Sequence, residues 1–368
     1  MALDPQRQRL ARQYARRQRL VTLADTVLGA ATLFALIATG TSAALADALS
    51  YPLPLKVAAY ALVAMLAFGL ATAPLSVYSG YVLPRRFGLS TQTWRSWLWD
   101  VLKSDLIGLG LGIALLVALY LLLSAFPNTW WIAAAVGVLL LSVVLTHLAP
   151  VLLLPLFFKQ RSLDDPVMAD RLTRLAERAG ARVRGVFTID LGSKGTSANA
   201  ALAGMGSTQR ILLSDTLLKD YSPEEIEAVM AHELGHHVGK HLWKTLAFHF
   251  GTVFVEFYLV NLVLHWAVDH WGFQGVADVA AFPLLALAIG AAMFLTRPLA
   301  LAFSRRLEAG ADAFALALTN APEHFVTMMA KLTDQNLGEG QPPRWIELLF
   351  YDHPPYYRRV ALAQRRGG

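Results

Sequence analysis

The chain has 368 residues and a formal net charge of +6, with 55% hydrophobic and only 16% charged residues. Soluble domains carry roughly 25% charged residues, so this composition, with a mean hydropathy of +0.45, excludes a chain of ordinary soluble domains and indicates extensive contact with lipid. The absence of cysteine also excludes disulfides and thiolate metal sites.

Apolar stretches long enough to cross a bilayer recur along the chain. About 20 apolar residues span the hydrocarbon core as a helix. Six runs meet this requirement: 21–46, 57–79, 106–126, 130–157, 245–268 and 279–303. One such run could be a buried core helix, but six in a charge-poor chain predict a multi-pass membrane protein.

Polar side chains inside these runs are costly in hydrocarbon and should face one another or an aqueous cavity between the helices. Isolated interhelical hydrogen bonds and snorkelling to the interface are the alternative. The residues concerned are His147, Glu256, Asn261, His265 and Arg297.

The placement of basic residues predicts the orientation in the membrane. Six arginines lie within the first 20 residues, and four basic residues separate the second and third runs. The loops on the opposite side, 47–56, 127–129 and 269–278, contain one basic residue, Lys56. Because short cytoplasmic loops are enriched in Lys and Arg, both termini are expected in the cytosol. The basic N-terminus resembles a signal sequence but lacks a small-residue cleavage site, which favours an uncut anchor.

This pattern divides the chain into four parts. We expect an N-terminal anchor with four transmembrane helices in 1–157, a cytosolic segment in 158–244, two further transmembrane helices in 245–303 and a second cytosolic segment in 304–368. The two cytosolic segments together have the size of one domain. They are therefore expected to pack together beneath the helices.

The stretch YSPEEIEAVMAHELGHHVGKH carries the strongest chemical signal. Ser222 and Glu225 form the pattern of a capping box, which predicts a helix start. His232 and His236 lie four residues apart, so their imidazoles share one helix face and can bind one zinc ion. Glu233 lies beside that face and can accept a proton from a metal-bound water. A solvated, histidine-rich helix face is the alternative.

A third ligand is expected in the second cytosolic segment, within SRRLEAGADAFA. Glu308 and Asp312 are four residues apart and share a helix face. Glu308 could complete a His2Glu zinc site, while Asp312 could accept a hydrogen bond from a ligating histidine. Alternatively, Glu308 pairs with Arg305 on an exposed helix.

These motifs resemble the type I CAAX prenyl endopeptidases, a family of integral-membrane zinc metalloproteases of the gluzincin type. HELGHHVGKH resembles the family's zinc helix, and SRRLEAGADAFA its third-ligand element. LGSKGTSANAALAG, ILLSDTLL and HPPYYRR resemble the remaining elements. Their order and spacing match from about residue 80 to the C-terminus.

The resemblance implies a mainly α-helical, multi-pass membrane protein, with about six and possibly seven transmembrane helices around a cavity. A cytosolic α+β zincin-like protease domain would be built from the two polar segments. One Zn²⁺ per chain would bind His232, His236 and Glu308. Two departures stand out: Gly195 replaces a basic residue, and one span is missing near the N-terminus.

The resemblance also assigns roles around the metal. Glu233 would act as general base, and Asn199 would contact the substrate backbone. His353 and Arg359 would steady the oxyanion or the bound peptide, and Asp312 would orient a zinc-binding histidine.

Short strands are expected at 183–189 and 209–213, where β-favouring side chains gather. A strand near Asn199–Leu202 could offer a free edge to which an extended substrate adds. A purely structural sheet beside the zinc helix is equally compatible with these residues.

The sequence therefore predicts a zinc-dependent membrane endopeptidase. The expected partners are the lipid bilayer and either prenylated C-terminal peptides or damaged membrane proteins as substrate, with no nucleic acid. The excess of Arg over Lys (24 against 8) favours a bacterial inner membrane. The alternatives are a protease that cuts inside transmembrane helices and a catalytically silent scaffold or transporter of the same fold.

Overall fold

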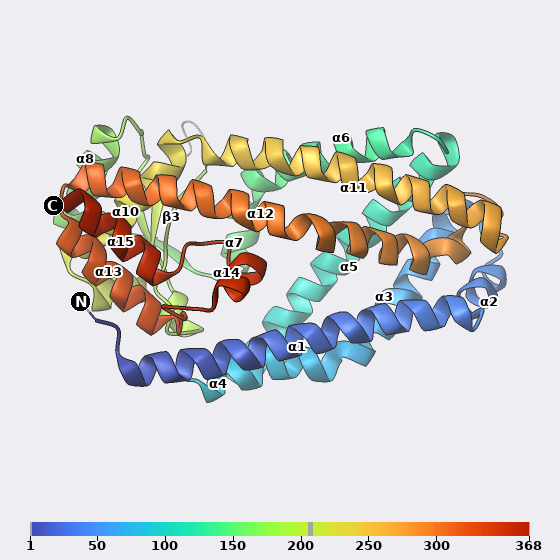
Figure 1. Ribbon diagram of the computed structural model, residues 1–368, viewed down its shortest axis with the longest axis horizontal. Coiled ribbons are helices and arrows are strands. Elements are labelled where there is room, and N and C mark those ends of the chain that lie inside the picture. Colours follow the sequence, from blue (N-terminus) through green and yellow to red (C-terminus); the bar gives the residue numbers. More distant parts are fainter. Residues whose placement is uncertain (1, 205–208, 368) are drawn as a thin grey trace.

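The computed structural model describes residues 2–204 and 209–367, which form an elongated molecule with long helices along its axis and a polar domain at one end (Figure 1). Among these residues, six helical segments are long and apolar enough to cross a membrane. They are α1 (Pro5–Ala38), α3 to α4 (Leu53–Arg86), α5 (Trp94–Ala125), α6 to α7 (Trp130–Phe157), α11 (His241–Trp271) and the segment Val279–Thr319, which contains α12. The predicted multi-pass architecture is confirmed.

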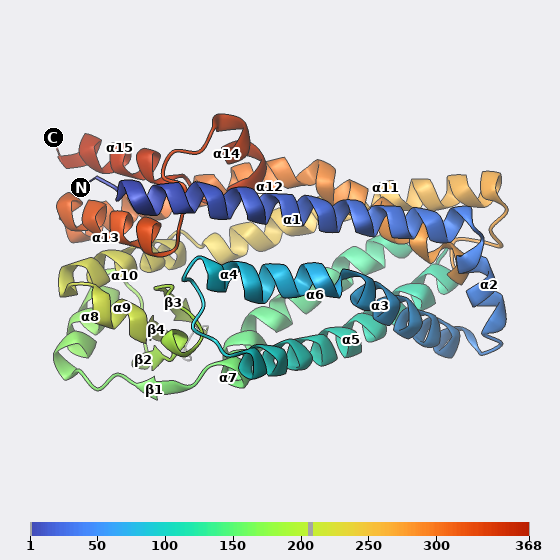
Figure 2. The same cartoon turned by 90° about the horizontal axis from the view of Figure 1, so that it is seen from below.

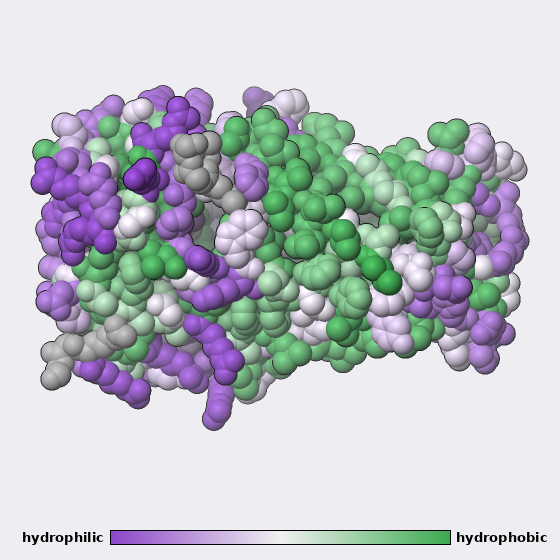
Figure 3. Space-filling model, turned by 90° about the horizontal axis from the view of Figure 1, so that it is seen from above, coloured by the Kyte–Doolittle hydropathy of each residue, from purple (hydrophilic) through white to green (hydrophobic). Residues whose placement is uncertain are grey.

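Short π-helical turns interrupt two of these segments. The second span consists of α3 (Leu53–Val77), a π turn and α4 (Leu83–Arg86), and the fourth of α6 (Trp130–Leu148), a π turn and α7 (Leu154–Phe157). Apolar side chains form a broad band between two hydrophilic ends (Figure 3). A band with this arrangement fits the hydrocarbon layer of a bilayer.

The first span differs from its expected range of 21–46. Helix α1 begins after Asp4, whose carboxylate caps the helix, and ends at Ala38. Gly40 then adopts φ = 69°, a left-handed conformation that suits glycine, and the separate helix α2 (Thr41–Ala48) follows. The glycine therefore breaks an apolar run that composition alone would continue.

The basic first half of α1 lies beside the helices of the polar domain (Figure 2). Arg7 Nε donates to the Asp334 carbonyl at 3.0 Å, and Arg19 pairs with Glu339 at 2.7 Å. The N-terminal arginines therefore also attach the anchor helix to the C-terminal segment.

The domain contains a four-stranded sheet in the order β1-β2-β4-β3, made of β1 (Gln160–Ser162), β2 (Val186–Ile189), β4 (Arg210–Ser214) and β3 (Ala200–Ala203). Strands β2 and β4 are parallel, and the outer two pairs are antiparallel. The expected strands at 183–189 and 209–213 correspond to β2 and β4. Strand β3 lies at the edge of the sheet, as the substrate-binding hypothesis requires.

Among the described residues, six helices from the two polar segments complete the domain. They are α8 (Pro166–Arg178), α9 (Asp215–Asp220), α10 (Pro223–Val238), α13 (Pro322–Gln335), α14 (Arg344–Phe350) and α15 (Tyr356–Gly367). One hydrophobic core joins Leu172, Ile211 and Met230 of the first segment to Ala315 and Phe325 of the second. Neither segment could bury these side chains alone, which explains why the two form one domain.

Helix α12 (Phe282–Thr319) connects the membrane to the domain without a break. The expected boundary at 303/304 falls inside this helix. The sixth span thus continues directly into the turn that carries Glu308, and the helix ends only where Asn320 adopts a left-handed conformation with φ = 49°.

Several polar residues within the spans form hydrogen bonds with a neighbouring helix or loop. The pairs are Trp130 with Asn261 at 2.8 Å, Glu256 with Thr296, and His265 with Asn128 at 3.1 Å. These bonds satisfy groups that would otherwise be costly in hydrocarbon.

Candidate metal centre

Helix α10 begins with the capping box that the sequence predicts. Ser222 Oγ accepts from the Glu225 amide at 3.3 Å, and the Ser222 amide donates to Glu225 Oε2 at 2.9 Å. The helix start is therefore fixed ten residues before His232, which is buried at 7% exposure. His236 is one turn further on and partly exposed.

Three side chains converge where α10 meets α12. The Nε2 atoms of His232 and His236 are 3.2 Å apart, and each lies 3.3 Å from a Glu308 carboxylate oxygen. Zinc ligands at about 2.0–2.1 Å in a tetrahedral arrangement are separated by roughly 3.3 Å. The three separations therefore have the values that a shared ion of this size would produce.

The absence of a hydrogen bond at one buried oxygen of Glu308 also favours a bound cation at this site. Within the described residues, its buried Oε2 atom has no hydrogen-bond partner, an arrangement that is unfavourable for a carboxylate oxygen. Two imidazole nitrogens and a carboxylate form a typical zinc donor set, with a coordination position left for water. The alternative in which Glu308 pairs with Arg305 is not observed, because Arg305 donates to the backbone carbonyls of Glu347 and Tyr351.

Both histidines have a partner at the nitrogen that faces away from Glu308. His232 Nδ1 lies 2.9 Å from Asp312 Oδ1, and His236 Nδ1 lies 2.9 Å from His241 Nδ1. Such partners fix the tautomer and the ring orientation of a metal ligand.

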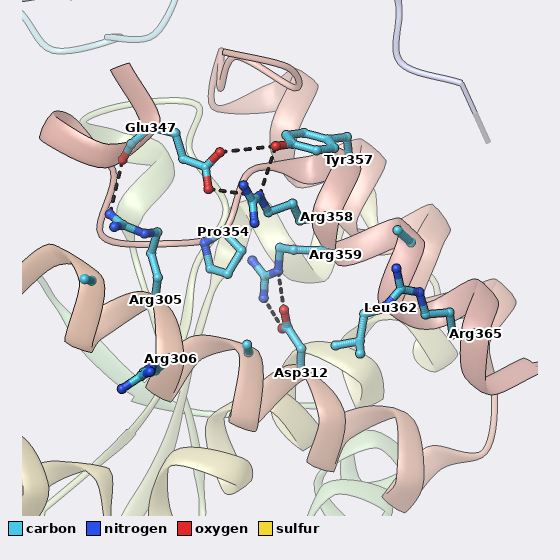
Figure 4. A pocket seen from close by; sticks show the side chains of 13 residues that line it. Arg305, Arg306, Asp312, Glu347, Pro354, Tyr357, Arg358, Arg359, Leu362 and Arg365 are labelled. Atoms are coloured by element: carbon cyan, nitrogen blue, oxygen red, sulfur yellow. Dashed lines mark hydrogen bonds and ion pairs between the residues drawn. The ribbon is translucent and has the colours of Figure 1, made fainter. Parts of the chain in front are cut away.

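Arg359 of α15 holds the other side of the Asp312 carboxylate (Figure 4). Its Nε donates to Asp312 Oδ2 at 2.8 Å, and a terminal nitrogen contacts Asp312 Oδ1. That nitrogen also lies 3.3 Å from His232 Nδ1. Arg359 was expected to act on the oxyanion or peptide, and its geometry adds a contact with the carboxylate that orients His232.

The site raises the pKa of three titratable side chains outside the spans. Burial lowers the pKa of His232, but the adjacent carboxylates of Asp312 and Glu308 outweigh burial and raise the pKa to about 9. Burial raises the pKa of Glu233, and the neighbouring histidines offset this only in part. The Asp352 carboxylate, 2.8 Å from His353 Nδ1, raises the pKa of that imidazole.

His353 reaches the same centre from the loop before α15. Its Nε2 lies 3.3 Å from Glu308 Oε2, and its side chain is half exposed. Asp352, the partner of His353, is not among the site residues that the sequence predicts, although its position directly before the histidine is a usable signal.

Two cavities meet at Glu233. A small one of about 160 Å³ is lined by Asn199, Glu233 and His353 among other residues. A larger one of about 780 Å³ is lined by Leu202, Glu233 and His236. Asn199 and Leu202 lie at and within edge strand β3, so the strand runs from one cavity to the other past Glu233.

Gly195, the departure from the expected basic residue, lies in a close backbone contact. A Cβ at this position would lie 2.8 Å from the Leu89 carbonyl oxygen. The preceding Lys194 forms an ion pair with Asp100 of α5 at 2.5 Å. This segment therefore joins the protease domain to the membrane helices.

Two family models match the chain. Peptidase family M48 matches residues 162–366, and the CAAX prenyl protease N-terminal family, described as five membrane helices, matches residues 2–159. The chain belongs to peptidase family M48. It is a membrane metalloendopeptidase, as the motifs predicted. Residues 2–159 form four candidate spans, one fewer than the matched family description counts.

Relatives of this M48 peptidase match most of its length. The uncharacterized metalloprotease YhfN of Bacillus subtilis is 26% identical over 99% of this chain and 87% of its own. A CAAX prenyl protease 1 homolog of Oryza sativa subsp. japonica is 27% identical over 79% of this chain and 69% of its own. The crystal structure of S. mikatae Ste24p has the same fold, with a TM-score of 0.87 at 21% identity over 98% of this chain and 90% of that one.

Proposed function

We propose that this M48 peptidase is a zinc-dependent endopeptidase whose ion binds His232, His236 and Glu308, one per chain. The observation that carries the proposal is the set of ligand separations of 3.2–3.3 Å around a buried carboxylate oxygen without a hydrogen-bond partner. A zinc ion bound there would lower the pKa of its water ligand and polarise the scissile carbonyl.

Two side chains perform the remaining chemistry. Glu233 accepts the proton that the attacking water loses and then delivers it to the leaving amine. His353 donates a hydrogen bond from Nε2 to the oxyanion that develops on the attacked carbonyl. Asp312 and Arg359 act as positioning residues, because they hold His232 through its outer nitrogen.

The substrate adds to the free edge of β3 as an extended strand. Such a peptide would run from the small cavity to the large one and place a carbonyl beside Glu233 midway. Asn199, exposed at the start of this edge, contacts the peptide backbone. This path accounts for both cavities with one substrate conformation.

The substrate is a membrane-attached protein with an accessible peptide segment, either a prenylated C-terminus or a damaged membrane protein. A relative from rice is named as a CAAX prenyl protease 1 homolog, which favours the first class. The bacterial composition favours the second, together with an inner-membrane location and a cytosolic active site. Cleavage inside a transmembrane helix is disfavoured, because α10 is not among the apolar spans.

The decisive experiment compares Glu233→Gln with Glu224→Gln, a partly exposed position on the same helix. Loss of the general base should lower the rate of peptide cleavage by about 10²–10⁴-fold. The zinc content should stay at one ion per chain. Glu224→Gln should cleave at the wild-type rate. Wild-type cleavage by Glu233→Gln would reject the mechanism, and a chain inactive in every form would support a silent scaffold.

Cleavage of a farnesylated CAAX peptide and of its unmodified twin separates the substrate classes. A strong preference for the farnesylated peptide supports prenyl-protein processing. Equal rates, with cleavage of an unfolded membrane protein in the same vesicles, support removal of damaged proteins.

A further inference from the structure

A third cavity lies behind the metal centre, on the far side of the Asp312–Arg359 pair. It has a volume of about 600 Å³ and lies between α12, α14 with the segment after it, and α15. Figure 4 shows arginine side chains from α12 and α15 around it. None of the proposed metal ligands lines this cavity, so the peptidase chemistry leaves it without a role.

The lining is strongly basic. Five arginines and only two carboxylates line the cavity, which gives an excess of three positive charges. The arginines are Arg305, Arg306, Arg358, Arg359 and Arg365, and the carboxylates are Asp312 and Glu347. Arg359 is paired with Asp312, and Arg358 with the buried Glu347 at 3.0 Å. Arg306 and Arg365 are exposed and form no ion pair with any residue that the structure describes. The charge is therefore available to an anion.

An apolar surface lies directly beside this cavity. Helix α14 buries Ile346 and Glu347 but exposes Trp345, Leu348 and Leu349 at 60%, 45% and 44%. These three residues share one helix face by their spacing of three and four. The helix stands out from its neighbours in Figure 2, so this face has no protein cover within the described part of the chain.

The position along the molecule places the apolar face of α14 and the side of the cavity that carries Arg305 and Arg306 at the edge of the bilayer. Arg305 and Arg306 follow the apolar run that ends at residue 303 on α12. In Figure 1, α14 lies beside α12 between the polar domain and the long membrane helices. Lipid phosphates lie at this level, just outside the hydrocarbon, and amphipathic helices place Trp and Leu at the same depth.

We propose that this cavity binds the headgroup phosphate of an anionic membrane phospholipid, whose acyl chains lie against Trp345, Leu348 and Leu349. Arg306 contacts the phosphate together with the free donors of Arg305, and Arg365 contributes positive charge from the opposite side of the cavity. Guanidinium groups match phosphate oxygens in charge and geometry. The exposed face of α14 explains why the occupant is a lipid rather than a free anion.

The test measures lipid binding and does not depend on peptide cleavage. Purified protein in detergent is titrated with dioleoyl phosphatidylglycerol or dioleoyl phosphatidylcholine, and bound lipid is counted by native mass spectrometry. The first phosphatidylglycerol should bind more tightly than phosphatidylcholine. Arg306→Gln/Arg365→Gln should weaken its binding by at least about fivefold, chiefly through the loss of Arg306.

A matched variant separates the site from overall charge. Arg9→Gln/Arg12→Gln removes the same two charges from exposed positions on α1 and should change the first binding step less than twofold. If the cavity double variant does not fold, the single variant Arg306→Gln carries the same test. Equal weakening by both double variants, or binding unaffected by the cavity variants, overturns the proposal. Displacement of the lipid by millimolar inorganic phosphate would also overturn it, because the site would then serve a free anion.

Discussion

Gly235 of α10 lies directly against the backbone of Ala311 of α12. A Cβ at Gly235 would lie 2.9 Å from the Ala311 Cα and 3.0 Å from its carbonyl oxygen, closer than packed atoms allow. Gly235 precedes His236 in the sequence, and Ala311 precedes Asp312. The glycine therefore permits the close approach that places both imidazoles opposite Glu308.

Gly235→Ala should force the two helices apart. Overpacking of this kind costs about 1–3 kcal/mol, and the same displacement lengthens the separation between Glu308 and the imidazoles. We expect a lower melting temperature and less than one zinc per chain after dialysis. Gly251→Ala on α11, where a Cβ meets nothing within 4 Å, should leave zinc content unchanged, and an equal loss in both variants would contradict the argument.

Asp312→Asn should weaken metal binding without removing a ligand. The carboxylate holds His232 Nδ1 at 2.9 Å and is itself held by Arg359. Its loss therefore frees the imidazole ring and leaves the partly buried Arg359 guanidinium without its carboxylate partner. Loss of such an outer partner typically costs 10–100-fold in metal affinity. Zinc affinity by competition with a chelator measures the effect.

Arg359→Gln should have a smaller effect in the same direction, because Asp312 still contacts His232. Asp170→Asn provides the control, since it removes a carboxylate from an exposed ion pair on α8. Wild-type zinc affinity in Asp312→Asn would show that this contact does not position the ligand.

Local sequence patterns were sufficient to predict the zinc helix and its cap. The spacing of His232 and His236 fixes their common face in any α-helix, and Ser222 with Glu225 fixes where that helix begins. The apolar runs likewise predict the spans, because the bilayer imposes their length. These features depend on residues close together in the chain.

Long-range contacts could not be predicted in the same way. Arg359 reaches Asp312 only because α15 folds back onto α12, and no spacing rule links residues 47 positions apart. The continuity of α12 was also missed, since composition changes from apolar to charged where the backbone does not. The contact of Arg19 with Glu339 depends on packing between the two ends of the chain.

The acid limb of the pH–activity profile should report Glu233. A general base must be ionised, and burial raises the pKa of this carboxyl above its ordinary value of 4.5. Activity should therefore fall as the pH drops through a value above 4.5 in a kcat/KM profile. Zinc content must be measured across the range, because protonation of the imidazole ligands would also release the metal. An acid limb at or below 4.5 with zinc retained would contradict the assignment.

The alkaline limb should depend on Asp352. The hydrogen bond from His353 Nδ1 to this carboxylate leaves Nε2 able to donate only while the ring is protonated. Because Asp352 raises the pKa of His353, the donor persists to higher pH than in an isolated histidine. Asp352→Asn removes that stabilisation, so the alkaline limb of kcat should move to lower pH while the acid limb stays in place.

His353→Gln completes this test. Removing one oxyanion donor should lower kcat about 10²–10³-fold, with little change in zinc content, because the ring is not a proposed ligand. In the His353→Gln background, Asp352→Asn should no longer move the alkaline limb of the kcat profile. If Asp352→Asn still moves that limb in the His353→Gln background, another group titrates there and His353 does not donate to the oxyanion.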